Sequence, residues 1–548
     1  MMCVMKHSCC IVRIYVLALC LLLVFVQVIA QDGCSVKGMA QFGAVASKGD
    51  YAPFWFTAGK QGVCPVETSS GYARYALSLD GSFGKRRDWG YNITADVVAG
   101  YNRESALALQ QAYGELLWRK VTLGVGCKER FSELKDFATL SPDAPFVNNG
   151  VNRSFSNLYS RRFTELSSGG LVYSGNSAPV PQVRLELPQY VVVPGTSEWL
   201  RVKGHIAYGF FADGSFQEEF TRENAAARYG KNIFYHNKAL FVNVGKPHKF
   251  PLTFEGGLEM YTQFGGDIYT HEGGKVLSMP AKAIDFVKAF IPLSGGGDTP
   301  EYEQTNISGN NVGSWHAAFT LHTKPVDVRL YAEHIFEDFS QLFFFEYQSD
   351  ASGDRNIIYY PWRDILVGVS VANKSGVFPF VSNVLYEYMS TYDQSGAAYN
   401  DPGPFFKEQM DGMDNYYNHS IYPGWHHRGM GMGSPLVVSP AYNKNGSLRF
   451  ASNRLVAHTV GVNGCFGKNI PLAYRLQYTY SENWGTYLNP FDTKRYTTSL
   501  LADVIYAPAG SCWAGSLSLG YDKSSFIGEN VGVMFTLARV LNFKEVRK

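Results

Sequence analysis

The sequence predicts an all-β protein: a transmembrane, antiparallel, up-and-down β-barrel of about 18 strands, with small helical segments that plug or cover the lumen. Three observations predict it. Aromatic residues make up 15% of the chain and glycine 55 of its 548 residues, while charged residues make up only 18%, below the quarter or so usual in soluble domains. Apolar and polar residues alternate along many short segments. Long and short connections between those segments also alternate.

The same composition excludes two other classes of protein. The mean hydropathy is −0.13, and no stretch after residue 30 approaches the roughly 20 apolar residues of a membrane-spanning helix. The formal net charge is +2, so no strongly basic surface points to nucleic acid as a partner.

The N-terminus predicts export to the cell outer membrane. Lys6 and Arg13 flank the start of an apolar run from Ile14 to Val26, and the small residue Ala30 follows shortly after it. This order is typical of a secretory signal peptide. We therefore expect a signal peptide at residues 1–30 and one barrel domain at residues 31–548.

The mature cysteines are few and show no C-x-x-C spacing for a metal or redox site. Cys34 and Cys64 are expected at opposite rims of the barrel, beyond the reach of a disulfide. Only Cys64 and Cys127, both near the outer rim, form a pair that a disulfide could join, and the sequence leaves that pairing open.

Period-two alternation marks the strands, for example at residues 252–263, 326–333 and 470–479. Counted back from a last strand at about Asn530 to Val540, the connections alternate between short and long, to a first strand near Val36 to Ala46. This sorting is typical of outer-membrane barrels, whose turns are short on the periplasmic side. The short connections include 119–120, 323–325 and 507–510; the long ones include 129–180, 265–312, 339–361, 391–452 and 482–494.

Three further segments complete the expected architecture. Residues 281–290 and 129–137 show helical spacing and are expected in or over the lumen. Residues 530–537 resemble the C-terminal signal that the barrel-assembly machinery recognises. We expect a monomer embedded in outer-membrane lipid.

No catalytic, cofactor or metal motif emerges. Glu255 and Glu259 lie four apart on one strand face, hence about 13 Å apart, too far for a glycosidase pair. His419, His426 and His427 have no nearby residue to complete a metal site and are expected as surface imidazoles. Inward-facing charges are expected to pair with each other as a polar network in the lumen, comprising Arg184, Glu255, Glu259, Arg329, Glu333 and Arg475.

Aromatic residues concentrate in the predicted outer loops, together with Arg and His. Sugar rings stack on aromatic faces, and their hydroxyls need polar partners. The alternatives are an interfacial aromatic girdle or packing within the loop, and for Trp425 packing and ligand binding are equally favoured. The candidate carbohydrate-binding residues are Tyr416, Tyr417, Trp425, His426, Arg428, Trp484 and Tyr487.

A family likeness is carried by residues 51–58, 113–115, 118–120, 166–171, 174–176, 181–185, 232–238 and 254–260. These stretches resemble the capsule assembly protein Wzi family, and the resemblance covers nearly the whole mature chain. One departure is at residues 176–181, where an arginine expected before the first proline is absent.

The resemblance implies an 18-stranded outer-membrane barrel, plugged by a small helical bundle, that acts as a lectin. The first functional hypothesis is therefore a non-enzymatic protein that attaches or organises capsular or other surface polysaccharide. The alternative is a pore or transporter for small solutes or oligosaccharides. Long loops and helical segments that block the lumen favour the first hypothesis.

Overall fold

The computed structural model describes residues 35–84, 89–103, 106–132, 166–291, 308–337, 345–349, 355–359, 363–374, 380–394, 414–466, 472–508 and 511–543. The signal peptide expected at residues 1–30 lies outside these ranges. So do Cys34 and most of the helix expected at 129–137, although residues 129–132 are described and are not helical.

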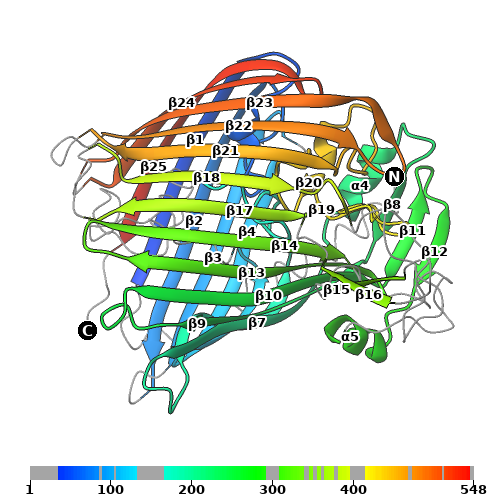
Figure 1. The fold of residues 1–548 in the computed structure, drawn as a ribbon. Coiled ribbons are helices and arrows are strands. Elements are labelled where there is room, and N and C mark those ends of the chain that lie inside the picture. The colour runs from blue at the N-terminus through cyan, green and yellow to red at the C-terminus, as the bar shows by residue number, and fades with distance from the viewer. Residues whose placement is uncertain are drawn as a thin grey trace.

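Eighteen strands in the described ranges form one closed antiparallel barrel (Figure 1), which confirms the predicted fold. Each strand pairs with the next barrel strand along the chain, and β1 closes the barrel by pairing with β25, from Val36 opposite Phe543 to Lys48 opposite Val531. The barrel strands are β1 (Ser35–Lys48), β2 (Ser69–Phe83), β3 (Trp89–Tyr101), β4 (Leu107–Trp118), β5 (Val121–Cys127), β6 (Gln182–Val192), β7 (Leu200–Phe210), β9 (Phe234–Val244), β10 (Leu252–Phe264), β13 (Asn310–His322), β14 (Val326–Glu337), β17 (Ile365–Asn373), β18 (Asn383–Ser390), β21 (Leu455–Cys465), β22 (Leu472–Gly485), β23 (Pro490–Tyr506), β24 (Trp513–Ser524) and β25 (Gly528–Phe543).

The alternation of side chains along each strand creates an apolar outer surface and a polar inner one. In β24, Leu517 and Leu519 point outward and are 48% and 55% exposed, whereas Ser516 and Ser518 point inward and are buried. Successive strand residues face opposite sides of a sheet, so this pattern places leucine against lipid and serine in the lumen. Within the described ranges, no helix has the length and apolar character needed to cross a membrane.

The connections are sorted as expected, with one correction. Turns such as 119–120 and 323–325 lie at one end of the barrel, and the long connections leave from the other. The connection at 482–494, however, is not a long loop. β22 continues to Gly485 and β23 begins at Pro490, because their alternating residues keep pairing well above the expected rim.

The long connections contain short elements of their own. β8 (Arg228–Lys231), β11 (Gly266–Thr270) and β12 (Lys275–Met279) form a small sheet, β15 (Phe345–Ser349) pairs with β16 (Arg355–Tyr359), and β19 (His426–His427) pairs with β20 (Met430–Gly431). The helices within the described ranges are α2 (Phe54–Thr57), α4 (Gly214–Thr221), α5 (Ala283–Phe290) and the 3-10 turn η1 (Pro440–Tyr442).

The lumen is filled by three segments, which we call the plug: residues 50–66, 166–181 and 414–453. Their side chains join those of the inner wall in one buried hydrophobic cluster that includes Trp55, Leu171 and Trp425. The helix expected at 281–290 is present as α5, but it does not lie in or over the lumen. It packs on the outside of the wall, against β9 and β10.

Candidate functional site

The aromatic residues expected on an outer loop form the interior of the plug. Tyr416, Tyr417, Trp425 and His426 are each 0–1% exposed, because the segment 414–453 turns back into the lumen. Trp425 donates through Nε1 to the Val172 oxygen at 2.9 Å. In this arrangement none of these four rings has a face open to solvent on which a sugar could stack.

His426 and His427 are buried and His419 is half-buried, which corrects the expectation of surface imidazoles. Burial lowers the pKa of both His419 and His426 to about 4, so both are neutral at pH 7. His427 Nδ1 lies 2.9 Å from the Ala178 oxygen. In the described part of the chain no three His, Cys, Asp or Glu side chains are grouped so as to hold a metal ion.

Carboxylates of the inner wall hold the backbone of the plug. A carboxylate that accepts a backbone N–H forms a charge-assisted bond, roughly twice as strong as a neutral one. Each of the three plug segments is bound in this way, so the plug is fixed to the wall along its length. The four anchoring carboxylates are Asp522 (to Phe54 N, 2.8 Å), Glu387 (to Ser168 N, 2.6 Å), Glu333 (to Leu171 N, 2.7 Å) and Glu337 (to Tyr417 N, 2.8 Å).

Two aspartates at the outer ends of strands hold the loops in the same manner. Asp364 accepts the Asp393 N–H and the Tyr416 hydroxyl, both at 2.9 Å. Burial raises the pKa of Asp364 to about 6. Asp213 accepts the Arg428 N–H at 2.8 Å. The backbone of Arg428 is thereby fixed beside α4, and its side chain is half-buried.

The six charged residues proposed as a lumen network all lie on the inner wall and are buried. Arg329 pairs with Glu255 at 2.5 Å, and Arg184 with Glu186 at 2.5 Å. The remaining contacts are Arg475 Nε to Asp503 Oδ2 at 2.7 Å, Glu259 Oε1 to His316 Nε2 at 3.1 Å, and Glu333 Oε1 to His316 Nδ1 at 3.5 Å.

Ser314, His316 and Glu333 have the residue types of a hydrolase triad, and Ser314 Oγ lies 2.7 Å from His316 Nε2. The His316 and Glu333 side chains have no solvent exposure. Glu333 holds the plug through the Leu171 N–H, and His316 Nε2 also contacts Glu259. A buried, structural polar cluster accounts for these contacts without any reaction.

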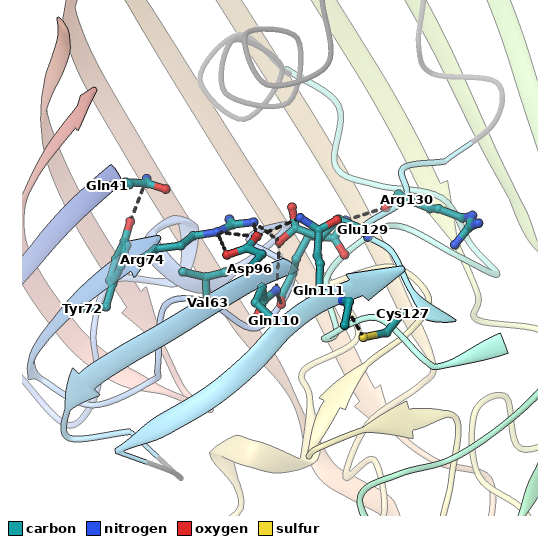
Figure 2. Close-up of polar contacts among 12 residues, drawn as sticks. Gln41, Val63, Tyr72, Arg74, Asp96, Gln110, Gln111, Cys127, Glu129 and Arg130 are labelled. Atoms are coloured by element: carbon teal, nitrogen blue, oxygen red, sulfur yellow. Dashed lines mark hydrogen bonds and ion pairs between the residues drawn. The ribbon is translucent and has the colours of Figure 1, made fainter. Parts of the chain in front are cut away.

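A second buried network was missed by the sequence reasoning (Figure 2). Arg74 pairs with Asp96, Nε to Oδ1 at 2.9 Å, and with Glu129, Nη2 to Oε1 at 3.1 Å. Gln110 and Gln111 are adjacent, yet both are buried, because a β-bulge in β4 leaves Gln110 without a partner on β3. The bulge turns two successive side chains inward, and period-two reasoning cannot find it.

An aromatic and cationic cluster stands at the outer rim; we call it the rim cluster, and it comprises Tyr392, Arg454, Trp484 and Tyr487. The Arg454 guanidinium lies 4.5 Å from the Tyr392 ring centre and 3.8 Å from that of Tyr487. Trp484 meets Tyr392 edge-on at 4.7 Å. Both Trp484 and Tyr487 remain partly exposed. Of the seven candidate carbohydrate-binding residues, Arg428, Trp484 and Tyr487 are therefore the ones within reach of solvent.

A small cavity lies between the plug and the wall near the outer end. It is about 20 Å³ in size, enough for one water-sized group, and Arg130, Arg184, Tyr173 and Tyr235 are among its lining residues. Arg130 donates to the Lys128 oxygen at 3.3 Å and pairs with no carboxylate among the described residues. Burial, reinforced by the Arg184 charge, lowers the pKa of Arg130. The cavity could receive one anionic or hydroxyl group.

The cysteines of the described residues are free thiols. Cys64 is buried and Cys127 half-buried, and neither forms a disulfide. The pair that the sequence left open is therefore not bonded.

Comparison with solved structures supports the outer-membrane barrel. The structure of Wzi from Escherichia coli gives a TM-score of 0.50 and is 11% identical in sequence. The match covers 92% of this chain and 84% of the Wzi chain. Wzi is described as an outer-membrane protein involved in group 1 capsule assembly and a carbohydrate-binding β-barrel. Two Pseudomonas aeruginosa structures match less well. OccK5 (8% identity, 94% and 99% coverage) scores 0.43, and OccK3 (9% identity, 93% and 96% coverage) scores 0.44.

No family model and no curated protein matches the sequence. At such low identity the likeness to Wzi shows the fold alone. That fold is the fold of an outer-membrane barrel, and it does not decide between polysaccharide binding and transport.

Proposed function

We propose that this protein is a non-enzymatic outer-membrane barrel that attaches or organises capsular or other surface polysaccharide. The observation that carries the proposal is the plug. Three segments fill the lumen with buried side chains, and wall carboxylates hold the backbone of each. A lumen occupied in this way suits a surface anchor better than a pore.

Under this proposal the buried aromatic residues and the exposed ones have different tasks. Tyr416, Tyr417, Trp425 and His426 give the loop a fixed shape. The polymer contacts the partly exposed rings of Trp484 and Tyr487 in the rim cluster, which stack on sugar. Arg454 is buried and packs against the Tyr487 ring, so it fixes the position of that ring. Arg428, beside α4, offers a second polar contact. Linked weak sites can retain a long polymer without any single tight site.

The proposal is supported, at the level of the fold, by the TM-score of 0.50 to a structure described as a carbohydrate-binding β-barrel. Sugar binding by this chain is part of our proposal. The alternative, a pore or transporter for small solutes or oligosaccharides, requires the plug to move.

Conductance in planar bilayers tests the closed lumen. The wild-type barrel should pass little current, and a variant in which a short Gly-Ser linker replaces residues 415–451 should conduct steadily, because one plug segment and its contacts to Glu337 are gone. Stable, open-pore conductance by the wild type would favour the transport alternative.

Polysaccharide retention tests the rim cluster. Trp484→Ala combined with Tyr487→Ala should shift part of the cell-bound polymer into the medium, with only partial loss because other contacts remain. Trp513→Ala is a matched control, since Trp513 is an exposed tryptophan at the opposite end of the barrel. Equal retention by the double variant and the control, with both barrels inserted, would remove the rim cluster as the site.

A further inference from the structure

Helix α5 is docked on the lipid-facing side of the barrel. Its Phe286 ring meets Phe234 of β9 at 5.2 Å and Phe264 of β10 at 5.0 Å, edge-on in both cases. These two residues share the outward parity of Leu240 and Leu252, which are exposed on the same strands. Since alternate residues of a strand face the same side, Phe286 packs on the outer wall, where Figure 1 also draws α5.

Two polar contacts fix the helix in this position. The Tyr208 hydroxyl donates to the Phe286 oxygen at 2.8 Å. Lys238 Nζ donates to the Ala289 oxygen at 3.1 Å, and it lies 5.6 Å from the Phe290 ring centre. The last carbonyls of a helix have no partner within the helix. An outward-facing lysine on a barrel strand therefore caps the C-terminal end of α5.

The opposite face of α5 is apolar and uncovered. Ile284, Val287 and Ile291 are 53%, 48% and 51% exposed. Their spacing of three and four residues places them on one side of the helix. The buried side, which holds Asp285 and Ala289, faces the wall. Exposed apolar residues grouped on one helix face mark a surface that interacts with a membrane or a partner.

The free face continues into an apolar groove on the barrel wall. The groove has a volume of about 900 Å³, within the range of pockets that take small molecules. Phe290 of α5 borders it at the helix, and Gly256 of β10 lines it. Outward-facing residues of the neighbouring strands also line it, among them Ile206, Leu240 and Leu258. This surface is continuous with the apolar belt of the barrel.

We propose that α5 and this groove form a lipid site at the outer leaflet of the membrane. An acyl chain lies in the groove along Ile206, Leu240 and Leu258, against Phe290. Ile284, Val287 and Ile291 insert among the neighbouring chains. The occupant is membrane lipid, because the groove opens onto the belt that already faces lipid. The inference rests on the barrel's place in the outer membrane and not on polysaccharide binding.

Quenching by lipids with brominated acyl chains tests the proposal, because bromine quenches a tryptophan that it contacts. Val287→Trp, Leu240→Trp and Glu272→Trp are each reconstituted in nanodiscs with and without brominated phosphatidylcholine, and the wild-type signal is subtracted. Leu240 lies in the belt at 60% exposure, and the Glu272 side chain is 81% exposed in the turn between β11 and β12 of the same connection. Phe319→Trp, also in the belt, replaces Leu240→Trp if that variant fails to insert.

The tryptophan at position 287 should lose at least half as much fluorescence as the one in the belt, and the one at position 272 should lose almost none. Equal quenching at positions 287 and 272 would overturn the proposal. A blue-shifted but unquenched signal at position 287 would also overturn it, since protein would then cover the helix. If that signal grew with the number of barrels per disc, the cover would be a second copy of this chain.

Discussion

Two long connections at the outer end of the barrel lie on opposite sides of the barrel wall. Residues 414–453 of one connection enter the lumen, where Trp425 is fully buried, whereas the other connection includes α5, which lies outside the wall with Ile284 and Val287 exposed. Both carry aromatic rings and apolar residues. The wall they meet differs: the inner face supplies carboxylates to backbone N–H groups, and the outer face supplies the aromatic rings of Phe234 and Phe264.

Loop composition alone does not decide on which side of the wall a connection lies. A plug in a polar lumen must satisfy its backbone groups, because an unpaired buried N–H costs about 1–3 kcal/mol. A helix satisfies its own backbone except at its ends, so it can lie against an apolar wall. Lys238 donates to the Ala289 oxygen at the C-terminal end of α5.

The largest expected effect is on the inner loop. Trp425→Ala should destabilise the plug by about 3–5 kcal/mol, because it leaves a large cavity and removes the bond to the Val172 oxygen. Hydrogen exchange should accelerate in residues 166–181 and 414–453. Trp484→Ala, at the rim, is the control and should change plug exchange little. Unchanged exchange in the Trp425 variant would mean that the loop does not occupy the lumen.

The second-largest expected effect is the pH dependence of local loop stability that Asp364 causes. Burial raises its pKa to about 6 from 3.8, so the folded loop retains a proton that the unfolded chain loses between about pH 4 and 6. Local stability should therefore fall as pH rises through this window, by about 3 kcal/mol at most, and level off above it. Hydrogen exchange at pH 4.5 and 7, corrected for intrinsic rates, measures this difference. Asp364→Asn should abolish it, and a pH dependence that survived this substitution would assign the effect to another group.

Glu387→Gln should have a smaller effect on the same side of the wall. The amide keeps the shape but weakens the charge-assisted bonds to Ser168 N and Ser167 Oγ, a loss of about 2 kcal/mol. Protease cleavage within residues 166–181 should become faster. Glu219→Gln, an exposed residue of α4, is the matched control. Equal cleavage in both variants would show that wall carboxylates do not hold the plug.

The smallest expected effect is on the connection that contains α5, outside the wall. Phe286→Ala should loosen α5 by about 1–2 kcal/mol, less than a fully buried phenylalanine costs, because the ring is only half-buried. Exchange should rise in residues 283–290 and stay unchanged in the plug. A rise in both regions would show that the two connections are coupled through the wall.

The sequence by itself determined the barrel. Alternation along residues such as 252–263 and 326–333 follows from having lipid on one side of a strand and the lumen on the other, and short connections such as 119–120 and 323–325 join neighbouring strands at one end of the barrel. It also located the helix at residues 283–290 to within two residues, because helical spacing is local. The β-bulge at Gln110 could not be predicted from the sequence, because an extra residue shifts the alternation without any characteristic residue type.

Only the tertiary structure decided which side of the wall each long connection takes. The same aromatic and histidine content suits an outer sugar-binding loop, a girdle or a buried plug, and the choice depends on distant partners. Tyr417 N meets Glu337, and Trp425 meets Val172 across more than 250 residues. Phe286 meets Phe234 on the far side of the same wall. These contacts join residues remote in sequence, so no local pattern contains them.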